Sequence, residues 1–450
     1  MVCHKHHNPQ GRLPQTGTPP LPIGSRTGSP RTPPSAGYRK LIRILEHGDA
    51  AALYKPPIII SDTVKDIVQN IRERGDEALC KYERQFTGHT GPLLVSDDDI
   101  KAAYDVIPSN IYDTIKKMAD TLRNSEHILY ETLNSIPASC MMREFLPIHS
   151  VGCYVPGGQA RYPSSAVMSI IPAAVSGVPD IVATSPPPID AATIVAAHYC
   201  GAHRIYQTGG AQAVAALAYG TETIRPVDKI VGPGGSIVSQ AKRLVSDVVS
   251  IDMDAGPTEL GIVADADASP DLVALDMISQ AEHSRDTFCF LLTDSHDMAE
   301  CVSNRIESRL HNIERSDIIR DSLYNNGFIV VCDTIYGALK MAERLAPEHL
   351  QIMTTNPRQD ALHVQSPGLI LLGHDTPSAA SDYMLGTNHI LPTNRQGRTR
   401  GPLSVLDFVK MKVTVQVDYK HLAQAAPHIQ NITASEGLYN HYEAVRSRIQ

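Results

Sequence analysis

The sequence lacks an excess of basic residues, a long apolar run and paired cysteines, and each absence excludes a class of protein. The 40 lysines and arginines are outnumbered by 48 acidic residues, giving a net charge of -8, so nothing favours binding to nucleic acid. No stretch approaches the roughly 18 apolar residues of a membrane span, and the first 30 residues hold no secretory apolar run. We therefore expect a soluble, cytoplasmic protein that acts on a small molecule and contacts neither nucleic acid nor membrane.

The eight cysteines show no C-x-x-C spacing, which argues against a zinc ribbon and against a disulfide framework. Cys153 stands beside Tyr154 inside an apolar stretch. A catalytic thiol is one interpretation of this residue, but a cysteine in an apolar strand is usually inert packing. We expect packing.

Residues 1–37 differ in composition from the rest of the chain. They contain eight of the 32 prolines and no acidic residue. A segment of this kind has too little apolar surface to bury, so we expect a disordered, proline-rich tail. The lack of acidic residues leaves targeting to an organelle open, although the proline content argues against a transit peptide.

The spacing of apolar residues changes near residue 149. Before it the pattern is mostly helical, and after it strands and helices alternate, beginning with SVGCYV, SAVMSIIPAAVSGV and DIVATS. A strand about every 25 residues with a helix between predicts βαβ units and a parallel sheet. Glycines gather where the strands end, as in PGG, TGG and GPGG, which is where ligands of open parallel sheets bind.

A second alternating series starts at ELGIVAD and ends at GLILLG. Two similar α/β domains facing each other would enclose a cleft. The G-x-G-x-x-G fingerprint followed by an acidic residue is absent, so the pattern by itself predicts a ligand-binding α/β protein and leaves a dinucleotide open. A shorter segment, LSVLDFVKMKVTVQV and two helical stretches, follows Pro402.

Two pairs of residues suit metal binding or proton transfer. Gln280 and His283 lie three apart near a helix end, which places both on one face and within reach of one metal ion. Glu348 and His349 precede the apolar strand LQIM, and a carboxylate beside an imidazole suits proton transfer near neutral pH. Each pair alone is more often an exposed helix end or strand start.

Two further groups of polar residues lie nearer the C-terminus. Asp382, Asn388 and His389 fall within SDYMLGTNHILPT, a segment rich in turn formers that is equally well explained as a structural loop. Glu436 and His441 lie in EGLYNHYEAV. Residues on one helix face recur three or four positions apart, so a separation of five does not place these two side chains together. The spacing alone therefore predicts no function for them.

Taken together and in order, these segments resemble the signature blocks of histidinol dehydrogenases. The blocks are VGCYVPGG, GGAQAVAALAYGT, VDKIVGPG, IDMDAGPTE, SQAEH, APEHL, SDYMLGTNHILPT and EGLYNH. The resemblance runs from about residue 38 to the end. It implies an α/β fold with two Rossmann-like parallel-sheet domains facing a cleft, and small helical N- and C-terminal segments exchanged across a homodimer.

The resemblance also implies how the chain is divided. Residues 151–257 would form the NAD-binding Rossmann-like domain. Residues 38–150, largely helical, together with 258–400 would form the α/β domain for zinc and substrate, and 401–450 the C-terminal dimerisation segment. The implied reaction is the oxidation of L-histidinol through L-histidinal to L-histidine with zinc and two NAD in turn.

The family's functional residues match specific positions of this chain. The four zinc ligands, which also contact substrate, match Gln280, His283, Asp382 and His441. His349 matches the base that takes the hydroxyl proton and also contacts substrate, and Glu348 matches the residue that activates water for attack on the aldehyde.

The remaining matches are binding contacts. His389 and Glu436 match further substrate contacts, and Tyr154 and Gln212 match contacts with NAD. As an oxygen and nitrogen donor set without thiolate, the zinc ligands would leave the ion strongly Lewis acidic.

Two positions depart from the family pattern. Gly235 stands where an asparagine contacts NAD, and Thr258 where a serine contacts substrate. Threonine keeps the hydroxyl, whereas Gly235 lacks the polar side chain. The sequence therefore predicts a zinc- and NAD-dependent histidinol dehydrogenase. Two alternatives stay open: a related dehydrogenase of another small polar alcohol, and a non-catalytic zinc-binding dimer.

Overall fold

The computed structural model describes residues 41–46, 60–135, 141–157, 161–253 and 256–450. All of them belong to one compact unit, Lys40–Gln450. The tail predicted for residues 1–37 lies outside the described residues. Among those described, no helix is long and apolar enough to cross a membrane.

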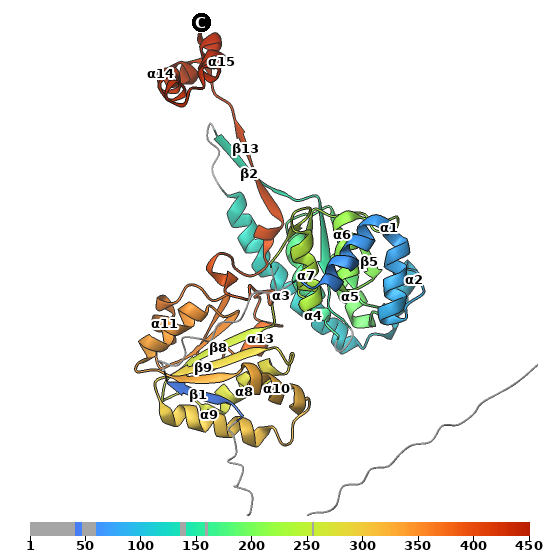
Figure 1. Ribbon diagram of the computed structural model, residues 1–450, viewed down its shortest axis with the longest axis vertical. Coiled ribbons are helices and arrows are strands. Elements are labelled where there is room, and N and C mark those ends of the chain that lie inside the picture. Colours follow the sequence, from blue (N-terminus) through green and yellow to red (C-terminus); the bar gives the residue numbers. More distant parts are fainter. Residues whose placement is uncertain (1–40, 47–59, 136–140, 158–160, 254–255) are drawn as a thin grey trace, which may run out of the picture. The chain divides into compact units, whose positions relative to one another are not determined.

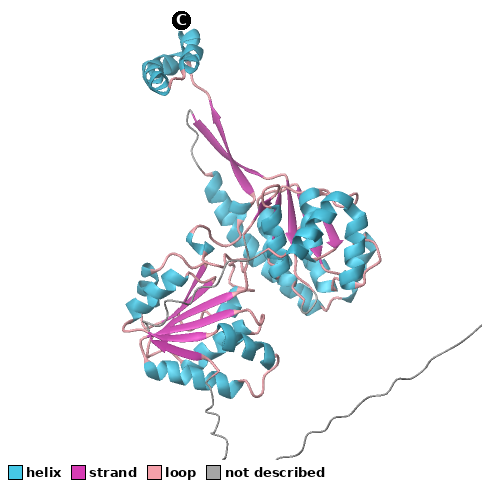
Figure 2. Cartoon of the chain, in the orientation of Figure 1, coloured by secondary structure: helices cyan, strands magenta, loops and turns pink. Residues whose placement is uncertain are grey.

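The region after residue 149 builds a parallel sheet of five strands, as the alternating pattern predicted (Figures 1 and 2). Its order is β5 (Arg204–Gln207), β4 (Asp180–Ser185), β3 (Ser150–Tyr154), β6 (Lys229–Val231) and β7 (Ser250–Ile251). Every residue of β3 is buried. A continuous apolar run is what a parallel strand covered on both faces requires.

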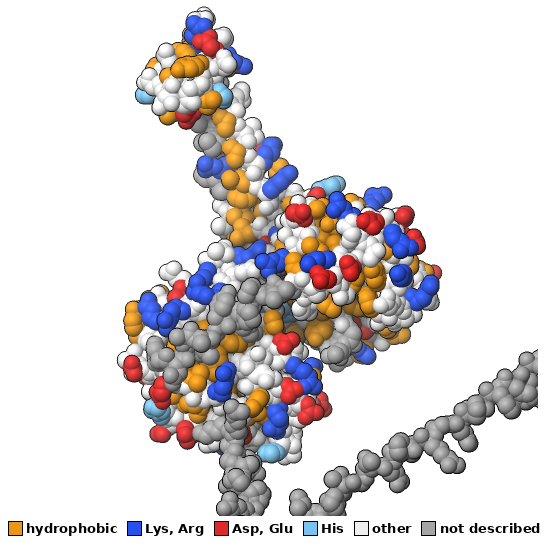
Figure 3. Space-filling model, in the orientation of Figure 1, with side chains coloured by type: hydrophobic (Ala, Val, Ile, Leu, Met, Phe, Trp, Pro, Cys, Tyr) orange, Lys and Arg blue, Asp and Glu red, His pale blue; other side chains and the backbone are white. Residues whose placement is uncertain are grey.

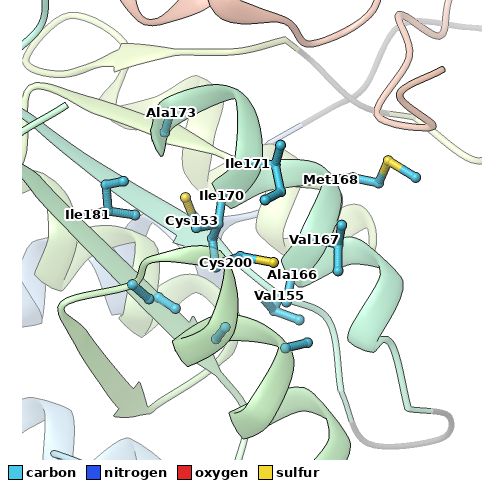
Figure 4. Packing of buried hydrophobic residues seen from close by; sticks show 14 of the residues in the cluster. Cys153, Val155, Ala166, Val167, Met168, Ile170, Ile171, Ala173, Ile181 and Cys200 are labelled. Carbon is cyan, nitrogen blue, oxygen red and sulfur yellow. The ribbon is translucent and has the colours of Figure 1, made fainter. Parts of the chain in front are cut away.

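Helices cover both faces of this sheet, and successive residues of β3 alternate between them. Cys153 joins a cluster with residues of α4 (Pro163–Val175) and α5 (Ala191–Cys200), which Figure 4 shows around Ile170 and Cys200. Tyr154 joins the opposite cluster, with α6 (Gly210–Tyr219) and α7 (Ser236–Val245). This alternation follows from the two-residue repeat of a strand.

The helices before residue 149 pack differently from the expected division. α1 (Asp62–Thr87) joins the cluster of α6 and α7, whereas α2 (Asp97–Val106) and α3 (Ser109–Asn134) join that of α4 and α5. The expectation that 38–150 belongs with 258–400 is therefore wrong for these three helices. Their apolar stripes required a partner, but the helical pattern did not specify which sheet provides it.

The second alternating series builds a parallel sheet of six strands. Its order is β1 (Arg43–Glu46), β10 (Phe328–Val331), β9 (Phe288–Thr293), β8 (Glu259–Ala264), β11 (His349–Met353) and β12 (Leu369–Leu372). β1 is the one described part of residues 38–150 in this sheet. The helices of this region are α8 (Pro270–Ala281), α9 (His296–Arg309), α10 (Ser316–Asn326), α11 (Ile335–Leu345), α12 (Pro357–Asp360) and α13 (Ser378–Ser381).

The C-terminal segment contains a strand followed by two helices, and the two helices confirm the helical stretches predicted there. β13 (Val409–Val415) pairs antiparallel with β2 (Met141–Pro147). α14 (Tyr419–Glu436) and α15 (Tyr439–Ile449) pack on each other and stay largely exposed. Apolar side chains lie along this two-stranded ribbon (Figure 3). In β13, Met411, Val413 and Val415 are each about half exposed.

Candidate active site

One cavity of about 290 Å³ lies where the carboxyl end of β6 in the five-stranded sheet meets the amino ends of β8 and β11 in the six-stranded sheet. The five-stranded sheet contributes the turn after β6, with Pro233, Gly234 and Gly235. The six-stranded sheet and its loops contribute most of the polar side chains, among them Thr258, Gln280, His283, Glu348, His349, Asp382 and His389. The structure thus gathers most of the sequence-predicted site residues in one place.

Gln280 and His283 reach the cavity from the end of α8. The helix stops at Ala281, so His283 lies in the turn beyond it and is exposed, and its N–H donates to the Gln280 carbonyl. The expected shared helix face is replaced by a turn that keeps both side chains at the cavity. Gln280 Nε2 donates to Thr258 Oγ1 at 2.9 Å, and Ser378 Oγ donates to Gln280 Oε1 at 3.3 Å.

Glu348 and His349 lie at the start of β11, inside the sheet. Both are buried, with 7% and 2% of their surfaces exposed, so the exposed strand start considered from the sequence is excluded. Glu348 Oε2 accepts hydrogen bonds from Thr258 Oγ1 at 2.6 Å and from Glu259 N at 2.9 Å. Thr258 therefore uses its hydroxyl to link the carboxylate of Glu348 to the amide of Gln280.

The imidazole of His349 lies between two carboxylates. Its Nδ1 is 3.8 Å from Glu348 Oε2 and its Nε2 is 3.6 Å from Asp382 Oδ1, and neither nitrogen has a hydrogen-bond partner. Burial lowers the pKa of His349, but Asp382 and Glu348 outweigh burial and raise it overall. Burial raises the pKa of Glu348, and the nearby His349 offsets only part of that rise. Each shift favours the protonated form of its group.

Asp382 and His389 come from one loop that folds back on itself. The Asp382 carbonyl accepts a hydrogen bond from His389 Nδ1 at 2.9 Å, which leaves Nε2 near Ser165 Oγ at 3.4 Å. Although burial opposes it, His349 and two other histidines lower the pKa of Asp382, keeping its carboxylate ionised. Asn388 is buried and donates to the Met168 carbonyl, so it holds the loop.

The three residues matched to NAD contacts lie in different surroundings. Gly235 lines the cavity, whereas Tyr154 and Gln212 are buried. Tyr154 Oη accepts a hydrogen bond from Gly210 N at 3.1 Å, and burial raises its pKa to about 12. Gln212 Nε2 donates to Glu83 Oε1 at 2.9 Å. In the described structure these two side chains stabilise the turn between β5 and α6 and do not line the cavity.

Glu83 also contacts the turn between β5 and α6, and the sequence analysis did not single it out. It is fully buried, and its Oε1 also accepts from Thr208 Oγ1 at 2.7 Å and Gly209 N at 3.1 Å. A carboxylate is favourable there because it lies at the N-terminus of α6. The available signal was an acid four residues after Leu79, on the apolar stripe of α1.

The glycines of the turn after β6 have different roles. Gly232 has a φ of +116°, and a Cβ there would lie 2.0 Å from the Tyr154 carbonyl oxygen, so only glycine fits. Gly235 has an ordinary φ of -63°, and a Cβ added there would meet no atom within 4 Å. A larger side chain is therefore sterically allowed at 235.

Three other residues singled out from the sequence lie outside the cavity. Glu436 ends α14 and His441 lies in α15, where both are exposed. Cys153 is fully buried, where burial raises the pKa of its thiol, and Figure 4 shows it among apolar side chains. The structure supports packing for Cys153 and brings neither Glu436 nor His441 to the site of the same chain.

The donors at the cavity suit a metal ion only in part. Gln280, His283 and Asp382 offer oxygen and nitrogen, the donor types that zinc accepts besides thiolate. Within the described residues, no three His, Cys, Asp or Glu side chains are grouped closely enough to hold a metal. The chain therefore supplies three matched ligands at the cavity, one of them an amide, and carries the fourth elsewhere.

Comparison with known proteins identifies the family of the chain. The sequence model of the histidinol dehydrogenase family matches residues 57–449. A histidinol dehydrogenase of Methanothermobacter thermautotrophicus is 40% identical over 86% of this chain and 93% of its own, and one of Methanopyrus kandleri is 38% identical over 91% and 99%. The crystal structure of histidinol dehydrogenase from Elizabethkingia anophelis matches with a TM-score of 0.85 and 30% identity, covering 92% of this chain and 99% of that one. The chain belongs to the histidinol dehydrogenase family of oxidoreductases.

Proposed function

We propose that the protein oxidises L-histidinol through L-histidinal to L-histidine, with zinc bound at the cavity and NAD as the hydride acceptor. The observation that carries the proposal is the position of Glu348 and His349. They are buried and adjacent, in a cavity that also holds Gln280, His283 and Asp382. Family membership supports the substrate.

In the first half-reaction, His349 takes the hydroxyl proton of the alcohol while hydride leaves the carbon for NAD. Neither ring nitrogen has a hydrogen-bond partner within the chain, so the unprotonated nitrogen is not already engaged by another group. The carboxylates of Glu348 and Asp382 stabilise the imidazolium that forms. The products are the aldehyde, NADH and one proton.

In the second half-reaction, Glu348 takes a proton from water as the oxygen attacks the aldehyde carbon. The resulting hydrate loses hydride to a second NAD and becomes the carboxylate. Burial raises the pKa of Glu348, which makes it a stronger base than an exposed glutamate. Thr258 and Glu259 N fix the carboxylate by hydrogen bonds to Oε2.

Zinc at Gln280, His283 and Asp382 would orient the substrate and polarise its oxygen. The side chain of Gln280 is held by two hydrogen bonds, since Nε2 donates to Thr258 Oγ1 and Oε1 accepts from Ser378 Oγ, and Oε1 is the atom that would bind the metal. His389 would contact substrate at the same wall of the cavity. NAD would lie along Gly234 and Gly235, with 151–257 as its binding region and 258–400 as the region for zinc and substrate.

Two chains would complete each site. Glu436 and His441 lie away from the cavity of their own chain, so we place them at the cavity of a second chain in a homodimer, with 401–450 as the dimerisation segment. The half-exposed apolar face of β13, with Met411, Val413 and Val415, supports this, because burial against a partner would remove that surface from water.

The test is the stoichiometry of NADH formed from a limiting amount of L-histidinol. Two NADH per L-histidinol, with L-histidine as product, are expected. A panel of other small polar alcohols is the comparison. Faster turnover of one of them would favour the related dehydrogenase, and zinc binding without any turnover would favour the non-catalytic dimer.

A further inference from the structure

We infer that Lys242 and Asp252 form a buried ion pair that positions the glycine turn for the dinucleotide, an inference that rests on the proposed binding of NAD at this turn. Lys242 lies in α7 and Asp252 directly follows β7. Their side chains are 1% and 0% exposed, and Lys242 Nζ contacts Asp252 Oδ1. Neither residue lines the cavity, so both act through the backbone that they hold.

The pair forms hydrogen bonds with both the N–H and the carbonyl of Gly232. Gly232 N donates to Asp252 Oδ2 at 2.8 Å, and Lys242 Nζ donates to the Gly232 carbonyl at 3.0 Å. Asp252 Oδ1 also accepts from Met253 N at 2.6 Å. One ion pair therefore ties the turn after β6 to the segment after β7.

Both of these segments lead into walls of the cavity. Gly234 and Gly235 follow Gly232, and Gly256 and Thr258 come shortly after Asp252. At Gly232 the backbone has a φ of +116° and lies against the Tyr154 carbonyl, so a small rotation would shift the whole turn. Holding Gly232 sets the position of the surface that NAD would contact.

Stability alone is a weak explanation for the pair. Removing two charges from water is costly, and apolar replacements of a buried ion pair are often at least as stable. Two charges that each bind a different backbone atom of one glycine instead specify geometry. A positioning role therefore predicts that folding and NAD binding respond differently when the pair is replaced.

The experiment compares the variants Lys242→Met, Asp252→Asn and Lys242→Met/Asp252→Asn in the zinc-loaded full chain. Each single variant leaves one buried charge unpaired and should lower the melting temperature. The double variant removes both charges and should regain most of that loss. Its dissociation constant for NAD, measured by titration calorimetry, should nevertheless rise about five- to tenfold, because the Gly232 carbonyl has lost its donor.

A matched control exists at the other end of the same strand. Lys229, the first residue of β6, donates to Asp407 Oδ1 at 3.0 Å, and both side chains are largely buried. Lys229→Met/Asp407→Asn alters another largely buried ion pair, in which Asp407 also pairs with Arg400, and this pair does not touch the glycine turn. It should leave the dissociation constant for NAD within about twofold.

The outcomes separate this inference from the proposed function. NAD binding by the Lys242→Met/Asp252→Asn chain within about twofold of the unaltered protein, or an equal loss in the control, would overturn the positioning role. Should that double variant not fold, Lys242→Met, which also removes the donor to the Gly232 carbonyl, gives the same readout below its melting temperature. Failure of the unaltered protein to bind NAD would instead overturn the proposed function.

Discussion

The residues around the cavity and the residues of the C-terminal helices carry the same kinds of side chain in opposite surroundings. Glu348 and His349 are buried and held by carboxylate, hydroxyl and backbone partners. Glu436 and His441, also a glutamate and a histidine near each other in sequence, are exposed at the ends of two helices that pack only weakly on the rest of the chain.

The difference shows what one chain can organise alone. Around the cavity, the fold of one chain gathers the residues that we propose as proton acceptors and three of the proposed metal ligands. In α14 and α15, Glu436 and His441 are exposed. We propose that the cavity is preorganised within one chain, whereas α14 and α15 contribute Glu436 and His441 to the cavity of a partner chain. The following predictions test each side of this comparison.

The largest effect is expected from removing zinc. Chelation should abolish turnover, and added zinc should restore it, because the metal orients the alcohol. His283→Ala and His441→Ala should each weaken zinc binding by more than about 100-fold, exceeding the cost of losing an outer-shell partner. Metal analysis of the dialysed variants is the measurement. Unchanged zinc binding by His441→Ala would remove the C-terminal region from the site.

A large effect confined to one half-reaction is expected from Glu348→Gln. Loss of a general base typically costs about 100- to 10,000-fold in rate. Oxidation of L-histidinal, which needs activated water, should fall by such a factor, and oxidation of L-histidinol should fall less. Single-turnover measurements with each substrate separate the two. Equal losses would show that Glu348 and His349 work as one unit.

A pH-dependent change in stability is expected from Glu126, which contacts the start of the C-terminal segment at Val405. Glu126 of α3 accepts a hydrogen bond from Val405 N at 2.8 Å, and burial raises its pKa from 4.5 to about 7. Between pH 4.5 and about 7, the folded state keeps the proton on Glu126 whereas the unfolded state loses it. The free energy of unfolding therefore falls as the pH rises through this range. The fall amounts to about 3 kcal/mol at most.

Glu126→Gln should remove that contribution, because the amide stays neutral and can still accept from Val405 N. Denaturant unfolding at pH 5 and pH 8 measures it. The free energy of unfolding of the variant should increase relative to that of the unaltered protein between pH 5 and pH 8. An identical pH dependence in both proteins would mean that Glu126 is already ionised when folded.

The smallest effect is expected at Gly235. The open space and ordinary φ at this position allow an asparagine. A new hydrogen bond contributes roughly 0.5 to 1.5 kcal/mol, so Gly235→Asn should tighten NAD binding by up to about tenfold. Calorimetric titration with NAD gives the dissociation constant. Weaker binding would indicate that the bound cofactor needs the space beside Gly235.

Sequence patterns predicted the sheets better than the site. Alternating strands and helices indicated both parallel sheets, since buried strands and glycine ends leave local signals. Local spacing could not place α1 on the five-stranded sheet, link Thr258 to Glu348, or reveal the pairing of Lys242 with Asp252, because these contacts join distant segments. The roles of Glu348 and His349 came from family resemblance, and their burial needed the structure.

Subunit mixing tests the shared site most directly. His349→Ala and His441→Ala chains should each be nearly inactive alone. Refolded together at equal amounts, about half of the dimers are mixed, and each mixed dimer has one site with both defects and one with none. Recovery of roughly one quarter of the unaltered activity is expected from this symmetry. Mixed dimers without recovered activity would show that each site is built within one chain.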